Sequence, residues 1–156
     1  FRSAGARVMD LFAGTGALGL EALSRGAKFC QFVEEGTEAR GVIRRNADAL
    51  GAIGLCKIWR RDATKLGPCA PQSPFDLVFV DPPWPRLEAD CAATARAIAA
   101  PVLQGHGVIV VEHPTRAPGG ALAALGVAPF DRRSYGDTTL SLFRPAVAGA
   151  AAPTTD

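Results

Sequence analysis

The 156-residue sequence lacks closely paired cysteines and any apolar run long enough to cross a bilayer, and we expect no export leader. A membrane helix needs about 20 consecutive apolar residues, and an export leader begins with a charged and then an apolar stretch. The cysteines form no C-x-x-C pair, which excludes the common zinc and dithiol motifs; they are Cys30, Cys56, Cys69 and Cys91. We therefore expect a soluble, cytoplasmic protein with reduced thiols, no metal site and no membrane partner.

The sequence also has little net charge. Its 17 basic and 15 acidic residues leave a formal charge of +2, so the composition neither favours nor excludes binding to nucleic acid. The length fits one domain, which we expect to cover residues 1–145. Residues 146–156, mostly alanine, proline and threonine, are expected to be disordered. Because the chain begins with Phe1 and enters its first strand almost at once, an amino-terminal segment is expected to be missing.

Apolar periodicity predicts strands that alternate with helices along the chain. Strands are expected at residues 6–12, 28–33, 55–59, 75–80, 107–111, 127–134 and 138–143, and helices at 15–24, 37–50, 88–100 and 121–125, with a loop at 65–73. The last two strands form an antiparallel hairpin. This order predicts an α/β fold: a doubly wound, mostly parallel, Rossmann-like sheet of seven strands.

A glycine-rich turn follows the first expected strand. Gly14, Gly16 and Gly19 have the G-x-G-x-x-G spacing, which lets the backbone turn sharply and approach a ligand closely. Asp10 ends the apolar run before this turn, and a carboxylate there repels a pyrophosphate and attracts an ammonium group. The alternative is a glycine loop that only closes a strand-to-helix turn.

Three more acids lie at the ends of expected strands: Glu34, Asp62 and Asp81. Glu34 comes twenty residues after Gly14, the distance at which a βαβ unit delivers an acid to a ribose. Because ligands of such sheets bind outside the carboxyl ends of the strands, four carboxylates are aimed at one edge. S-adenosylmethionine carries an ammonium, a ribose diol and an adenine amine, and it suits this edge. The alternative for Asp62 is a solvated acid beside two arginines.

The sequence Asp81-Pro82-Pro83-Trp84 follows the fourth expected strand. Two prolines fix the backbone and remove two amide donors, so the Pro82 carbonyl is held in place. An amine conjugated to a ring becomes a better nucleophile when acceptors hold its N–H bonds, and Asp81 and the Pro82 carbonyl are two such acceptors. Trp84 offers a face on which a base stacks. The motif therefore predicts methyl transfer to an amine without a metal; the alternative is a rigid turn.

Taken together, five segments resemble the RsmD family: residues 10–27, 32–34, 81–84, 110–113 and 135–140. The resemblance implies the class I methyltransferase fold and methylation of the exocyclic N2 of one guanine in bacterial 16S rRNA. The substrate is either free RNA or the assembling small subunit, and a monomer is the default expectation. The methionine part of S-adenosylmethionine would be held by Asp10, Phe12, Gly14, Thr15 and Gly16. Glu34 would hold the ribose, and Asp62 with the Ala63 amide would hold the adenine.

Two departures from the family pattern are expected to matter. Trp84 replaces the usual phenylalanine or tyrosine, and the basic amino-terminal segment of the family is missing. Three other functions remain open: an amino methyltransferase acting on DNA adenine or protein glutamine, a nicotinamide-dependent oxidoreductase, and a non-catalytic RNA-binding module. His113 is interpreted as a strand-end residue rather than a catalytic base. Tyr135 either stacks on a nucleotide or packs on the sheet.

Overall fold

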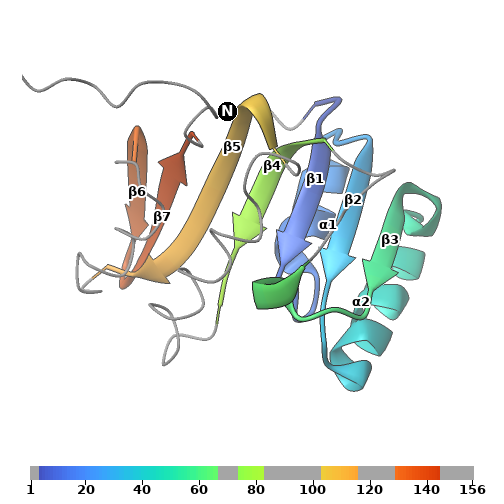
Figure 1. The fold of residues 1–156 in the computed structure, drawn as a ribbon. Coiled ribbons are helices and arrows are strands. Elements are labelled where there is room, and N and C mark those ends of the chain that lie inside the picture. The colour runs from blue at the N-terminus through green and yellow to red at the C-terminus, as the bar shows by residue number, and fades with distance from the viewer. Residues whose placement is uncertain (1–3, 67–73, 83–102, 116–128, 145–156) are drawn as a thin grey trace, which may run out of the picture.

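The computed structural model describes residues 4–66, 74–82, 103–115 and 129–144, which form one twisted sheet with helices beside it (Figure 1). The strands are β1 (Arg7–Leu11), β2 (Phe29–Val33), β3 (Cys56–Trp59), β4 (Phe75–Val80), β5 (Leu103–Pro114), β6 (Asp131–Tyr135) and β7 (Thr138–Phe143). The helices are α1 (Ala17–Ser24) and α2 (Thr37–Ala49), with short 3₁₀ turns η1 (Ile53–Leu55) and η2 (Ala63–Lys65).

The strand order is β3-β2-β1-β4-β5-β7-β6. Strands β1 to β5 are parallel, whereas β7 pairs antiparallel with both β5 and β6. The chain runs outward from β1 to β3 and then returns to place β4 on the other side of β1. The topological switch point therefore lies between β1 and β4, and the predicted seven-stranded, mostly parallel sheet is confirmed.

Some element bounds differ from the prediction. Strand β5 begins before residue 107 and continues to Pro114, because its polar end pairs with β7 from Thr138 onward. Strand β6 begins at Asp131 rather than residue 127. Helix α1 begins at Ala17 rather than residue 15, because Gly16 has a φ of 80°. The predicted helices at 88–100 and 121–125, and the tail at 146–156, lie outside the described residues.

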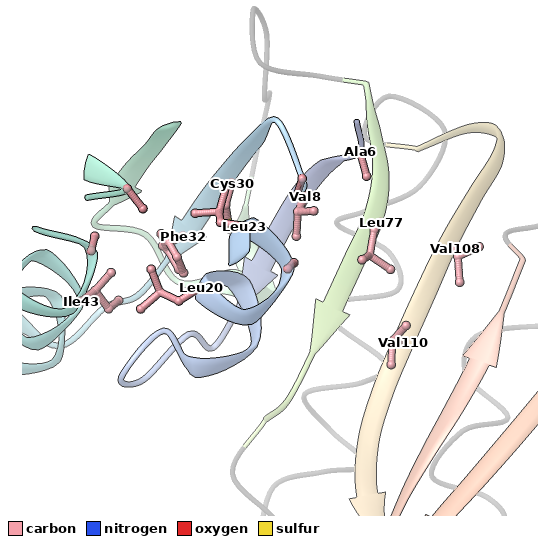
Figure 2. Packing of buried hydrophobic residues seen from close by; sticks show 14 of the residues in the cluster. Ala6, Val8, Leu20, Leu23, Cys30, Phe32, Ile43, Leu77, Val108 and Val110 are labelled. Carbon is pink, nitrogen blue, oxygen red and sulfur yellow. The ribbon is translucent and has the colours of Figure 1, made fainter. Parts of the chain in front are cut away.

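Two clusters of buried apolar side chains lie on the two faces of the sheet, because alternate residues of a strand point to opposite faces. Figure 2 shows the cluster that α1 and α2 cover; it includes Val8, Phe32, Leu77 and Val110 from four strands. All apolar side chains that α1 and α2 bury belong to this cluster. The described helices therefore cover one face, and the opposite cluster includes Met9, Val78 and Phe143.

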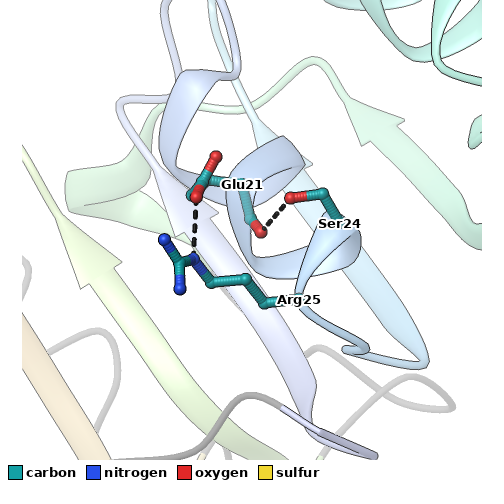
Figure 3. Close-up of polar contacts among 3 residues, drawn as sticks. All are labelled: Glu21, Ser24 and Arg25. Carbon is teal, nitrogen blue, oxygen red and sulfur yellow. Dashed lines mark hydrogen bonds and ion pairs between the residues drawn. The ribbon is translucent and has the colours of Figure 1, made fainter.

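Local contacts fix the carboxyl-terminal end of α1. Glu21 and Arg25 form an i,i+4 ion pair, at 2.7 Å, and the Ser24 hydroxyl donates to the Glu21 carbonyl (Figure 3). An exposed pair of this kind contributes about 0.3–0.5 kcal/mol. The Ala27 amide bonds the Ala22 carbonyl and the Gly26 amide bonds the Leu23 carbonyl, which is the Schellman pattern that ends a helix. In the described part of the chain, no helix is long and apolar enough to cross a membrane.

Gly19 is the point of closest approach between α1 and the sheet. A Cβ atom there would lie 2.5 Å from Cε1 of Phe32 and 2.6 Å from Sγ of Cys30, both buried in the core. Real Cβ atoms do not come so close, so only glycine fits. Its amide also donates to Oδ2 of Asp10 at 3.0 Å, which joins α1 to β1.

We expect Gly19→Ala to lower the free energy of unfolding by about 1–3 kcal/mol, because overpacking forces the core side chains and α1 apart. Gly41→Ala is the matched control. Gly41 also lies in a helix, but an added Cβ would meet only the end of the Arg45 side chain at 3.5 Å, so this variant should gain about 0.5–1 kcal/mol. Urea unfolding measures both. Equal effects of the two substitutions would contradict the close-approach argument.

Candidate active site

Four acids lie together at the carboxyl ends of neighbouring strands. The register aligns Val33, Leu11, Val80 and Val111 across β2, β1, β4 and β5, and all four point to the face opposite α1. The residues that come next in the chain are Glu34, Asp81 and Glu112. Because successive side chains alternate, these three point to the other face of the sheet, which α1 covers. Asp10 precedes Leu11 and lies on that same face. Three of the predicted acids are thus brought together with Glu112.

Asp10 is buried, with 1% of its surface exposed, and its carboxyl accepts the Gly19 amide. Burial, together with the charges of Asp81, Glu34 and Glu112, raises the pKa of Asp10 to about 8, although the Gly19 hydrogen bond acts to lower it. These groups include no lysine or arginine of the described chain. Asp10 therefore has no positive partner among the described groups that shift its pKa. A site of this kind is chemically suited to a cationic ligand.

Glu34 connects the glycine-rich turn to the end of β2. Its Oε1 accepts the Gly14 amide at 2.9 Å, and its Oε2 accepts the Gly36 amide at 2.7 Å. Arg40, buried in α2, donates to the carbonyls of Glu34 and Glu35 and so fixes the loop behind the carboxylate. A carboxylate oxygen has more than one acceptor position, so each oxygen can also accept a ligand hydroxyl.

The turn from Phe12 to Gly16 has an uncommon backbone. Phe12 has a φ of 57°, which side chains of this size rarely adopt, while Gly14 and Gly16 have φ values of 57° and 80°. Such strain costs about 1–3 kcal/mol and persists where the surrounding structure holds it. Here the Phe12 side chain packs against the core, and the amide of Ala13 donates to the Val33 carbonyl at 3.2 Å. Thr15 is exposed at the tip of the turn.

Asp62 and Ala63 lie at the start of η2, beyond the end of β3. Oδ1 of Asp62 accepts the Thr64 amide at 2.9 Å and the Thr64 hydroxyl at 2.7 Å, so this carboxylate caps the 3₁₀ turn. Ala63 is buried in the cluster on the face opposite α1 and α2. Asp62 is not among the acids that raise the pKa of Asp10.

Asp81 is half-buried directly after β4, and Pro82 beside it is buried. Burial and the adjacent Glu112 carboxyl together raise the pKa of Asp81 to about 7. Pro83 and Trp84 lie outside the described residues. Sequence reasoning did not include Glu112 in the site, since its proximity to Asp81 depends on the pairing of β4 with β5. The sequence does carry one signal for Glu112, because it directly follows the apolar run of β5, as the predicted acids follow theirs.

His113 makes two hydrogen bonds within the sheet. Its Nε2 lies 2.7 Å from the Ser141 hydroxyl and its Nδ1 lies 2.9 Å from the Pro114 carbonyl. The side chain is buried on the opposite face from Glu112. This geometry agrees with a strand-end residue rather than a catalytic base. Tyr135, by contrast, is 64% exposed beside the β6–β7 turn.

A cleft of about 420 Å³ lies between α1 and α2, but it contains none of the predicted site residues. Its lining is Ala17, Leu20, Glu21, Ser24, Asn46, Ala49 and Leu50. Within the described ranges, no three His, Cys, Asp or Glu side chains are arranged to hold a metal ion. The acids at the carboxyl edge of the sheet are therefore the arrangement with the clearest chemical meaning.

Comparison with known proteins gives the family. The sequence matches the family described as Conserved hypothetical protein 95 over residues 2–144. It is 37% identical over 81 residues to "Ribosomal RNA small subunit methyltransferase D" of Escherichia coli, covering 52% of this chain and 40% of that protein. The chain belongs to the RsmD family. The Bacillus subtilis protein YlbH, named as a candidate rRNA methyltransferase, is 34% identical over 111 residues, which are 70% of this chain and 60% of that one.

The RsmD family resemblance extends to the fold. The structure of the candidate methyltransferase yhhF from Escherichia coli has a TM-score of 0.72 and 25% sequence identity, with 93% of this chain and 78% of that chain covered. The fold is that of the class I methyltransferases, with antiparallel strands at the carboxyl end. The matched part of this chain spans 60% of the length of YlbH and 40% of the length of the Escherichia coli methyltransferase D.

We expect Asp10→Asn to change how stability depends on pH. The folded protein holds the Asp10 proton more tightly than the unfolded chain, since its pKa is raised from 3.8 to about 8. The free energy of unfolding of the wild type should therefore fall as the pH rises between these values, by at most about 1.4 kcal/mol per pH unit from this group. Asparagine does not titrate and its oxygen can still accept the Gly19 amide.

Urea unfolding of both proteins at pH 6 and pH 8 measures this difference. The variant should gain stability relative to the wild type as the pH rises. Parallel pH dependence in the two proteins would show that Asp10 does not hold its proton in the folded state.

Proposed function

We propose that this chain transfers a methyl group from S-adenosylmethionine to the exocyclic N2 amine of a guanine in 16S rRNA. Membership of the RsmD family and the names of its relatives support the reaction and the substrate. The observation that carries the proposal is the set of carboxyl groups on one face of the sheet, of which Asp10, Glu34 and Asp81 were predicted from the sequence. The substrate is free RNA or the assembling small subunit, and the protein acts in the cytoplasm as a monomer.

The residues at this edge fit S-adenosylmethionine better than a nicotinamide dinucleotide. Three further carboxyl groups raise the pKa of Asp10, so the edge gains by binding positive charge. A pyrophosphate would add negative charge to the same acids. This electrostatic argument disfavours the oxidoreductase alternative, although Glu34 suits a ribose in either ligand.

The chain's own groups divide into a cofactor part and an acceptor part. The turn formed by Asp10, Phe12, Gly14, Thr15 and Gly16 binds the methionine part, with Glu34 on the ribose hydroxyls and Asp62 and the Ala63 amide on the adenine. S-adenosylmethionine, when bound, supplies a methyl carbon activated by a positively charged sulfur. The strained Phe12 backbone and the two amides on Glu34 keep the turn in one shape before the ligand arrives.

The acceptor part is Asp81, Pro82, Pro83 and Trp84. An Asp81 oxygen and the Pro82 carbonyl accept the two N–H bonds of the guanine amine, which turns the nitrogen lone pair away from the ring. Trp84 stacks on the base after it has been flipped out of the RNA, a contact that contributes about 1–3 kcal/mol. Burial of Pro82 and Asp81 at the end of β4 holds these acceptors in place.

Tritium transfer from labelled S-adenosylmethionine to purified 16S rRNA, followed by nucleoside digestion, tests the reaction. We expect label in N2-methylguanosine, and a loss of about 10²–10³ in rate for Asp81→Asn, because one acceptor oxygen is replaced by an amide donor. Asp48→Asn, an exposed position on α2, should keep the wild-type rate. Label in N6-methyladenosine would contradict the guanine substrate, and cofactor binding without transfer would favour a non-catalytic RNA-binding module.

Binding of S-adenosylmethionine should strengthen as the pH rises from 6 to 8. Because the pKa values of Asp10 and Asp81 are raised, these groups must lose their protons before they attract a cation at full strength. The affinity for S-adenosylmethionine should therefore rise by up to about tenfold per pH unit for each proton released. S-adenosylhomocysteine, which lacks the sulfonium charge, should show a weaker dependence. Calorimetry in two buffers of different ionisation enthalpy counts the protons, and identical pH dependence for the two ligands would contradict this expectation.

A further inference from the structure

Asp81 and Glu112 form a pair of acids across neighbouring strands. Val80 of β4 is aligned with Val111 of β5 in parallel register, so the residues that follow lie side by side on the face covered by α1. Both side chains are half-buried, and the Glu112 carboxyl lies close enough to Asp81 to raise its pKa. Two carboxylates have no hydrogen to share and repel each other, so the pair is most stable when one proton lies between the two groups.

The surroundings of the pair favour that proton. Asp10 of β1 and Glu34, directly after β2, lie on the same face of the sheet as the pair. The Gly19 amide of α1 already donates its hydrogen bond to Asp10. Burial and the adjacent Glu112 raise the pKa of Asp81 to about 7, whereas an isolated aspartate ionises near 3.8. A group that accepts a proton during a reaction works best when its pKa is near the working pH.

We propose that Glu112 is a positioning residue for the methyl transfer and acts through Asp81. Glu112 shares a proton with Asp81, and this prepares Asp81 to accept the proton that the amine releases at neutral pH. This inference rests on the proposed function. The amine nitrogen uses its lone pair to form the new N–C bond while the C–S bond breaks and its electron pair stays on sulfur. The nitrogen is left with one positive charge, and it loses a proton to an ionised Asp81 oxygen, from which the proton passes to water.

A merely structural role for Glu112 has a different consequence. In that case its replacement would lower stability, but the ionisation of Asp81 and the shape of the pH–rate profile would stay the same. Glu112→Gln separates the two roles, since it keeps the size of the side chain and can donate an amide hydrogen to the ionised Asp81. Glu38→Gln, at an exposed position in the first turn of α2, makes the same charge change away from the pair.

Two measurements on each protein test the proposal. The first is a ¹³C NMR titration of the Asp81 carboxyl carbon in the protein without substrate. We expect its midpoint to fall by at least one pH unit in Glu112→Gln and to stay near 7 in Glu38→Gln. In the wild type, an Asp81 midpoint near the ordinary value of 3.8 would overturn the proposal without any variant.

The second measurement is the single-turnover rate of methyl transfer at pH 6 and pH 8. With Asp81 as the acceptor, the wild-type rate should rise about tenfold over this range, whereas the rate of Glu112→Gln, with its lowered midpoint, should rise no more than about twofold. An unchanged rate ratio in the variant would overturn the proposal. If the wild type forms no N2-methylguanosine, the proposed function fails and the role in methyl transfer fails with it, while the NMR titration still decides whether Glu112 controls Asp81.

Discussion

Parallel strands of matched register end together, and this constraint determines what meets at the carboxyl edge of the sheet. Because the residues of β2, β1, β4 and β5 are aligned row by row, residues one position beyond the apolar row share a face. Glu34, Asp81 and Glu112 occupy those positions, and Asp10 lies one position before the row on the same face. The sheet thus gathers acids that are up to about a hundred residues apart in the chain, and the proposed chemistry depends on that gathering.

Gathering acids in this way has a cost in stability. Asp10 is buried, its pKa is raised by desolvation, and the other three acids raise it further. The folded protein tolerates the cluster because Asp10 accepts a backbone amide and because protonation relieves part of the repulsion. The same imbalance favours a positively charged ligand, so the feature that weakens the free protein is the one that would bind the methyl donor.

The glycine-rich turn shows how close packing and site shape are coupled. Gly19 allows α1 to lie against Phe32 and Cys30, and that contact brings its amide within reach of Asp10. On the other side of the turn, Glu34 accepts the Gly14 amide, while Phe12 holds an uncommon backbone conformation through its packing on the core. The turn is therefore shaped by contacts with two strands.

The sequence alone determined the order of strands and helices and the acids at the ends of β1, β2 and β4, because apolar periodicity and glycine stops are signals carried by adjacent residues. The tertiary structure decided the partner of Asp81, the capping of η2 by Asp62, and the hydrogen bonds of His113 within the sheet. It also extended β5 to Pro114, through pairing with β7. These features depend on strand order and register, which join distant parts of the chain, so no local pattern in the sequence contains them.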